Sequence, residues 1–181
     1  MVLLNNPYVP MTLRLGIFTL SAAALALAAG IQHYTIIYRN AEPAGTRVAQ
    51  EPSTTMAICV QSCALVYLFY ITYDEYSSKP LGLRNAKNKV KLIMLDLIFI
   101  IFSSANLALT FNTLFDQDWI CRAPADKGET DYTPYDPKLC RRQRGLAAFL
   151  LLVLVMWVMT FAISILRVVE RVSGSVESGI S

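Results

Sequence analysis

The sequence has few charged residues and almost no histidine. Charged side chains make up 16% of its 181 residues, and 55% of the residues are hydrophobic. Soluble domains carry about 25% charged residues, so this composition indicates a membrane protein. The formal net charge of +3 is small and scattered along the chain. That charge distribution and the absence of any nucleic-acid motif exclude nucleic acid as a partner.

The sequence also lacks the motifs of common enzymes. It has no HExxH, GxSxG or P-loop pattern. Its single histidine, His33, lies near the end of an apolar run, where packing at the interface is the usual role. Cys59 and Cys63 lie one helical turn apart, but two thiols are too few for a metal site, so we expect buried, small side chains there. The sequence therefore predicts no catalytic residue, no metal site, no cofactor and no enzyme.

Four long apolar runs dominate what remains. They predict helices at about residues 13–38, 54–73, 91–114 and 145–169, each long enough to cross roughly 30 Å of hydrocarbon. The first run is longer than the apolar core of a signal peptide, so we expect a retained helix. The prediction is an all-α integral membrane protein, with residues 1–181 forming one four-helix bundle.

One carboxylate, Asp96, interrupts the third run. An acid inside hydrocarbon is costly unless it faces protein or a wet cavity. Asp96 is close to Lys91 and hence near one membrane surface, which favours a structural contact over an ion pathway. Ser103 lies seven residues later on the same face, and Asn106 is a further polar residue of the span. We expect these three residues to form an intramembrane polar anchor whose partners on the other helices the sequence does not identify.

The first run contains small residues at a spacing of four, namely Ala22, Ala26 and Gly30. Such a face lets helix backbones approach closely in lipid. It is a candidate helix-packing face, although alanine filling an ordinary helix explains the pattern equally well.

A basic loop joins the second and third runs. Its five cations are Lys79, Arg84, Lys87, Lys89 and Lys91. Cations beside a membrane attract anionic lipid, by about 1 kcal/mol each. They also fix orientation through the positive-inside rule, and that explanation is sufficient without lipid binding.

Cysteines predict which side of the membrane each loop faces, because the basic residues divide evenly between the two sides. Cys121 and Cys140 both lie in the connector at 116–144, and loop cysteines pair in oxidising compartments. We therefore expect a Cys121–Cys140 disulfide, an extracellular or lumenal 116–144 loop, cytosolic termini and a cytosolic tail at 170–181.

Short motifs in the second half resemble fungal MARVEL-domain proteins, and in particular the small four-span group that includes the yeast non-classical export protein of eisosome domains. The matching pieces are Leu95-Asp96 with a following Ala105-Asn106, Cys121, Cys140-Arg141-Arg142-Gln143 and Ala147-Ala148-Phe149. The resemblance implies a four-helix bundle with cytosolic termini and no catalysis. It also implies a role in lateral membrane domains rich in sterol or sphingolipid, or in membrane traffic.

The first functional hypothesis is thus a membrane-organising scaffold of the plasma membrane. It would bind anionic lipids and other membrane proteins, as a homo-oligomer or as a subunit of a complex. An accessory subunit of a larger membrane enzyme is the second hypothesis, because lipid-facing and protein-facing apolar surfaces look alike. A small transporter or channel that uses Asp96 is the third.

Overall fold

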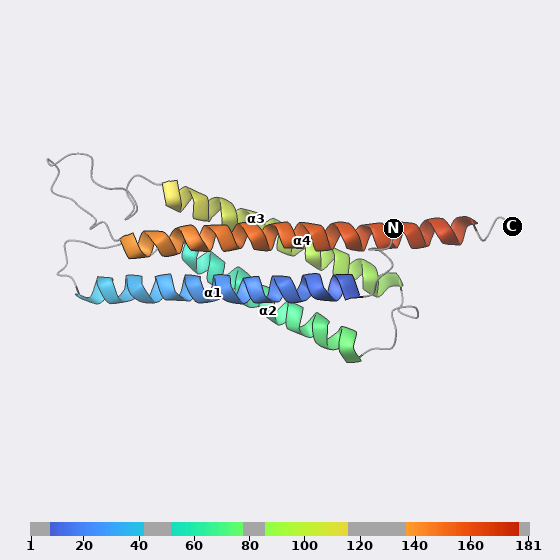
Figure 1. Cartoon of the computed structure of the whole chain (residues 1–181), viewed down its shortest axis with the longest axis horizontal. Helices are drawn as coiled ribbons and strands as arrows, with labels where there is room; N and C mark the ends of the chain where they lie inside the picture. Colours follow the sequence, from blue (N-terminus) through green and yellow to red (C-terminus); the bar gives the residue numbers. More distant parts are fainter. Residues whose placement is uncertain (1–7, 42–51, 78–85, 116–136, 178–181) are drawn as a thin grey trace.

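The computed structural model describes residues 8–41, 52–77, 86–115 and 137–177, and every one of these ranges is helical. The four helices are α1 (Tyr8–Ala41), α2 (Pro52–Ser77), α3 (Ala86–Phe115) and α4 (Pro137–Glu177) (Figure 1). Each contains a segment long and apolar enough to cross a membrane, namely Met11–Ile37, Pro52–Tyr73, Lys91–Phe115 and Pro137–Val169. The predicted all-α, four-helix architecture is confirmed, while insertion into a membrane stays a prediction.

All four helices extend beyond the predicted bounds. The largest difference is in α4, which begins at Pro137 rather than at residue 145 and runs on to Glu177. Residues 137–144 therefore belong to a helix and not to the loop, and most of the predicted tail is helical as well. Proline is well tolerated at the first position of a helix, where no backbone N–H is needed. An apolar run predicts only the part of a helix that suits lipid. The helices are longer than predicted because their backbone hydrogen bonding continues into the polar residues on either side.

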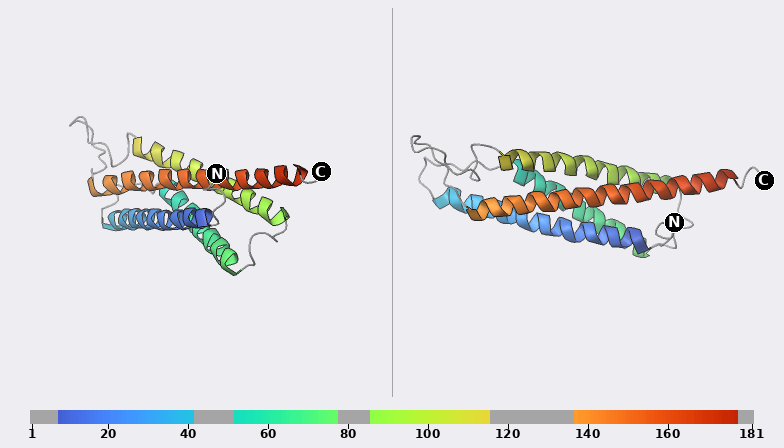
Figure 2. Two further views of the ribbon diagram at one scale, coloured as in Figure 1. Left: turned by 45° about the vertical axis from the view of Figure 1, so that its right-hand side comes forward. Right: turned by 45° about the horizontal axis from the view of Figure 1, so that its top comes forward.

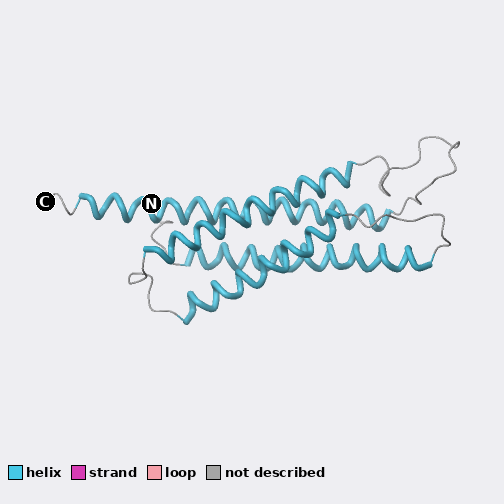
Figure 3. Tube along the Cα trace, turned by 180° about the vertical axis from the view of Figure 1, so that it is seen from behind, coloured by secondary structure: helices cyan, strands magenta, loops and turns pink. Residues whose placement is uncertain are grey.

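The helices run up and down, and each packs against two others. α1 packs on α2 and α4, and α3 packs on the same two helices (Figure 1, Figure 2). The start of α1 and the end of α4 lie at one end of the bundle, called the terminal end below, and the opposite end is called the distal end. α4 projects past the other three helices at the terminal end (Figure 3).

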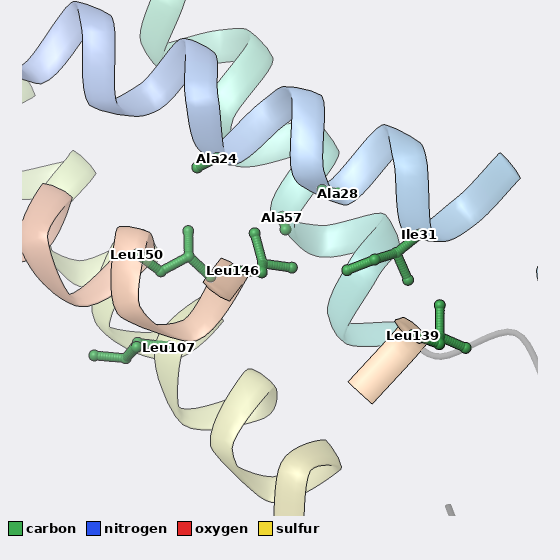
Figure 4. Packing of buried hydrophobic residues seen from close by; sticks show 8 residues of the cluster. All are labelled: Ala24, Ala28, Ile31, Ala57, Leu107, Leu139, Leu146 and Leu150. Atoms are coloured by element: carbon green, nitrogen blue, oxygen red, sulfur yellow. The ribbon is translucent and has the colours of Figure 1, made fainter. Parts of the chain in front are cut away.

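The interior contains two apolar clusters. The distal cluster consists of Ala24, Ala28, Ile31, Ala57, Leu107, Leu139, Leu146 and Leu150. The terminal cluster consists of Ile17, Ala64, Leu68, Val153 and Trp157. In the distal cluster, leucines of α4 reach toward small alanines of α1 and α2 (Figure 4). Large side chains facing small ones bring the backbones close together, which favours helix association in lipid.

The buried stripe of α1 differs from the small face proposed above. Ala26 is exposed, and Ala22 and Gly30 are half-buried. The residues that α1 buries recur every three or four positions and are Arg14, Ile17, Ser21, Ala24, Ala28, Ile31 and Thr35. Alanines lie all around this part of α1, so their spacing does not identify the packed face. A role for Ala22, Ala26 and Gly30 in contacts between chains stays a prediction.

Candidate functional site

Asp96 is buried between α3 and α2, with 1% of its surface exposed. The Tyr67 hydroxyl donates a hydrogen bond of 2.9 Å to Asp96 Oδ1. The same hydroxyl lies 3.4 Å from the Leu92 carbonyl oxygen, one turn earlier on α3. Tyr67 is thus the partner on α2 that the sequence did not identify, and it joins the two helices near the terminal end.

Three stacked aromatic rings surround this contact. The Tyr67 and Phe99 centroids are 4.9 Å apart, those of Phe99 and Trp157 are 5.2 Å apart, and those of Tyr67 and Trp157 are 6.0 Å apart. These rings come from α2, α3 and α4, and Trp157 is 1% exposed. Such pairs contribute about 0.5–1.5 kcal/mol beyond their burial. The stack holds three helices together beside the carboxylate, which suits a fixed structural contact.

Four other polar residues of α3 form a buried line toward the distal end. Asn106 and Thr110 are fully buried, and Ser103 and Thr113 are 2% and 3% exposed. Thr113 donates a hydrogen bond of 3.0 Å to Ser53 Oγ on α2. Asp96, Ser103 and Asn106 therefore all lie inside the protein, and Thr113 extends their line to a second contact between α2 and α3.

Three buried carboxamides form a feature of which the sequence analysis identified only Asn106. Gln61 on α2, Asn106 on α3 and Gln143 on α4 each have 0% of their surface exposed. Within the described part of the chain, neither amide atom of any of the three has a hydrogen-bond partner. For Gln61, an amide inside an apolar run was the available signal, because it is costly in hydrocarbon for the same reason as an acid. Gln143 lies among arginines before the apolar run and carries no such signal in the sequence.

At the distal end, α1 and α4 meet through one cation and one ring. The Arg142 guanidinium carbon lies 4.2 Å from the centroid of the Tyr34 ring, and Arg142 Nη2 is 3.4 Å from the Tyr34 hydroxyl oxygen. Exposed cation–π pairs contribute about 0.5–1 kcal/mol. This contact fixes the first turns of α4 against the end of α1.

Most of the predicted basic loop lies outside what the structure describes. Lys79 and Arg84 fall between the described ranges, and Lys87 and Lys89 lie in the first turn and a half of α3, with side chains that are not described. Lys91 is exposed. The anionic-lipid contact stays a prediction for all five residues.

The three cysteines that the structure describes lie in two different environments. Cys140 is 3% exposed and is bonded in a disulfide. Cys121 lies outside the described residues, so its pairing with Cys140 stays a prediction. Cys59 and Cys63 are free and exposed on the outer face of α2. The expectation that these two are buried was wrong, because α2 buries the neighbouring stripe of Ala57, Ala64 and Leu68 instead.

Among the described residues, no group of three or more histidine, cysteine, aspartate or glutamate side chains is placed to hold a metal ion. What the geometry assembles is a set of contacts between helices, both polar and aromatic. These contacts hold the four helices together.

Comparison with known proteins assigns the family. Residues 1–174 match the family model described as the SRF1 C-terminal domain. The chain belongs to the SRF1 C-terminal domain family. It is 49% identical over 173 residues to a protein of Saccharomyces cerevisiae named "Regulator of phospholipase D SRF1". The match covers 95% of this chain and 39% of the yeast protein, so the chain spans about two fifths of its relative's length. No solved structure matches.

Membership of the SRF1 C-terminal domain family overturns the MARVEL resemblance. The MARVEL, tetraspan and eisosome assignments were wrong, since the family match extends over nearly the whole chain. The motifs that carried the resemblance were short. Several of their residues have structural roles in this bundle, among them the Asp96 contact and the buried Gln143.

Proposed function

We propose that this chain is a membrane-embedded, non-catalytic regulator of a phospholipase D. The observation that carries the proposal is the 49% identity, over 95% of the chain, to a protein named as a regulator of that enzyme. Because the chain corresponds to 39% of that relative, the proposal concerns only the part of the regulator that this chain matches.

A membrane bundle suits this task for a physical reason. A phospholipase D attacks phospholipids at the surface of a bilayer. A regulator held in the same bilayer meets the enzyme in two dimensions, which raises its effective concentration without any new contact. The exposed apolar residues of α2 and α4, such as Val66, Phe69, Val155 and Met159, would face lipid or a partner's helix.

The topology proposed from the sequence belongs to this account. Both termini and the basic loop at 74–91 would face the cytosol, and the 116–144 connector would be extracellular or lumenal, with the plasma membrane as the expected location. Maleimide labelling of intact cells tests the sidedness and the disulfide together. Cys121 should react with an impermeant maleimide only after reduction; labelling without reductant would contradict the disulfide.

Co-purification tests the partner. A tagged form of this chain should retain a phospholipase D after gentle solubilisation of membranes from the same cells. The matched control is a tagged four-span protein of another family at equal abundance. Recovery of the enzyme with both baits, or with neither, would contradict a specific association.

The exposed position of Ala26 favours one further element of the proposal, which is self-association. Ala22, Ala26 and Gly30 present small side chains outside the buried stripe of α1, where a second copy could approach closely. Cross-linking through Ala26→Cys, in a background without Cys59 and Cys63, should yield dimers. Absence of dimers at native abundance would contradict it.

A further inference from the structure

Three polar side chains, one each from α1, α2 and α3, are enclosed by the bundle. Ser21, Gln61 and Asn106 each have 0% of their surface exposed. In the described ranges, the Ser21 hydroxyl and both amide atoms of Gln61 and of Asn106 have no hydrogen-bond partner. Each residue lies well inside its membrane-length segment, at least nine residues from either end.

Gln61 and Asn106 lie at the same height on two helices that pack together. The Tyr67 ring of α2 stacks on the Phe99 ring of α3 and so marks one shared height. Gln61 precedes Tyr67 by six residues, and Asn106 follows Phe99 by seven. Because α2 and α3 run in opposite directions, the two amides are within about one residue's rise, roughly 1.5 Å along the axis.

Ser21 lies at this height as well. A Cβ added at Gly16 would be 2.9 Å from the Met156 methyl group, so Gly16 and Met156 share a height. Met156 precedes Trp157, whose ring stacks on Tyr67. Ser21 follows Gly16 by five residues, and Gln61 precedes Tyr67 by six. Because α1 and α2 run in opposite directions, both offsets lead toward the distal end, so Ser21 and Gln61 lie at about the same height.

These groups need partners, because an unsatisfied polar atom in hydrocarbon is unfavourable by several kcal/mol. Each carboxamide offers two donors and a carbonyl oxygen, and a serine hydroxyl both donates and accepts. A buried water typically makes about three hydrogen bonds to polar groups of this kind. We propose that Ser21, Gln61 and Asn106 form a hydrated polar site inside the bundle, in which water molecules bridge α1, α2 and α3.

Gln143 provides the matched comparison. It is buried and its amide atoms lack a partner in the described chain, as for Gln61 and Asn106. However, it precedes Leu150 on α4 by seven residues, and Leu150 lies at about the height of the three bridged residues. Gln143 is therefore nearly two helical turns closer to the distal end, roughly 10 Å along the axis. It does not share the proposed water molecules.

A double-mutant cycle on the full chain in detergent micelles tests the bridging. Unfolding equilibrium constants are measured for Gln61→Leu, Asn106→Leu and the double variant. Removing one amide leaves the other amide and the Ser21 hydroxyl unsatisfied, whereas removing both amides leaves only the Ser21 hydroxyl. The double variant should therefore be more stable than independent effects predict, by about threefold in the equilibrium constant, the typical coupling of polar contacts between membrane helices. The pair Gln143→Leu and Asn106→Leu should combine independently.

Water-edited solid-state NMR of the unmodified protein in vesicles identifies the bridging molecule. The side-chain amides of Gln61 and Asn106 should receive magnetisation from water faster than the adjacent buried Leu107. Coupling without this transfer would mean a direct amide–amide bond and would overturn the hydrated site. Independent effects in the cycle would overturn it too. If the variants fail to fold, the transfer measurement alone decides.

Discussion

In the terminal half of the bundle, the buried polar group has a protein partner and lies among aromatic rings. Asp96 accepts a hydrogen bond from Tyr67, and Phe99 and Trp157 stack on that tyrosine. In the distal half, leucines pack on alanines, and the amides of Asn106 and Gln143 have no partner among the described residues. The terminal half is thus held by a few large, specific contacts, and the distal half mainly by close approach of backbones, with smaller contacts such as the Thr113–Ser53 hydrogen bond. Substitutions should therefore affect the two halves in different ways.

The largest effect is expected at Trp157, where Trp157→Ala removes the ring that connects α4 to the stack. Loss of a fully buried aromatic side chain should lower the free energy of unfolding by about 3–5 kcal/mol, measured by denaturant titration in micelles. Val158 is the control, since it is 46% exposed on the same helix, and Val158→Ala should change stability by less than about 0.5 kcal/mol. Equal effects would show that the stack is not what holds this half.

Overpacking should be the next most damaging change, and it tests the distal half. Ala28 is fully buried in the distal cluster, so Ala28→Leu should lower the free energy of unfolding by about 1–3 kcal/mol. Ala26 is exposed two residues earlier, and Ala26→Leu should be neutral for folding. A neutral Ala28→Leu would mean that backbones in the distal half are not closely packed.

Removing the Tyr67 hydroxyl should have a moderate effect. Tyr67→Phe keeps the stack but leaves Asp96 Oδ1 without this donor, so stability should fall by about 1.5 kcal/mol in the same titration. Tyr70→Phe is the control, because Tyr70 is 65% exposed.

Ion flux across vesicles containing Asp96→Asn should equal that of the unmodified protein. A loss of flux in a well-folded Asp96→Asn variant would instead support a transporter.

The smallest effect is expected at the contact between Thr113 and Ser53. Thr113→Val removes a hydrogen bond between helices and should lower stability by about 0.6 kcal/mol. The Thr110 and Thr113 hydroxyls both lie within hydrogen-bond distance of a carbonyl oxygen one turn earlier in their own helix, but the Thr113 hydroxyl also contacts Ser53 on α2. Thr110→Val should therefore change stability less, and a larger effect than that of Thr113→Val would contradict the role given to this contact.

The sequence predicts the number and approximate positions of the helices because a helix that crosses hydrocarbon needs about 20 mostly apolar residues. Runs of that length can be read directly from the sequence. It does not predict their ends. Residues 137–144 are mostly polar and start with proline, yet they form the first turns of α4. Backbone hydrogen bonding has no need of apolar side chains, so composition places the ends of these helices poorly.

Partners across the bundle were harder still to predict. The burial of Asp96 follows from its chemistry, but Tyr67 lies 29 residues away on another helix, and no local pattern connects the two. Ala22, Ala24, Ala26 and Ala28 look alike in the sequence, although only Ala24 and Ala28 are buried. Gln61 lies between Cys59 and Cys63 in the sequence, and its buried amide, rather than the two thiols, is the informative group. The MARVEL resemblance was wrong for a similar reason, since it was based on short local motifs. Such motifs in mostly apolar sequences match many unrelated proteins by chance.

Headgroup release by a phospholipase D in reconstituted vesicles tests the central claim most directly. The enzyme is assayed on vesicles that contain this chain, and on vesicles with an equal amount of an unrelated four-span protein. The account predicts a rate that changes with the ratio of chain to enzyme and saturates, while vesicles containing the chain without enzyme release no headgroup. An unchanged rate at all ratios, or release by the chain alone, would contradict a non-catalytic regulator.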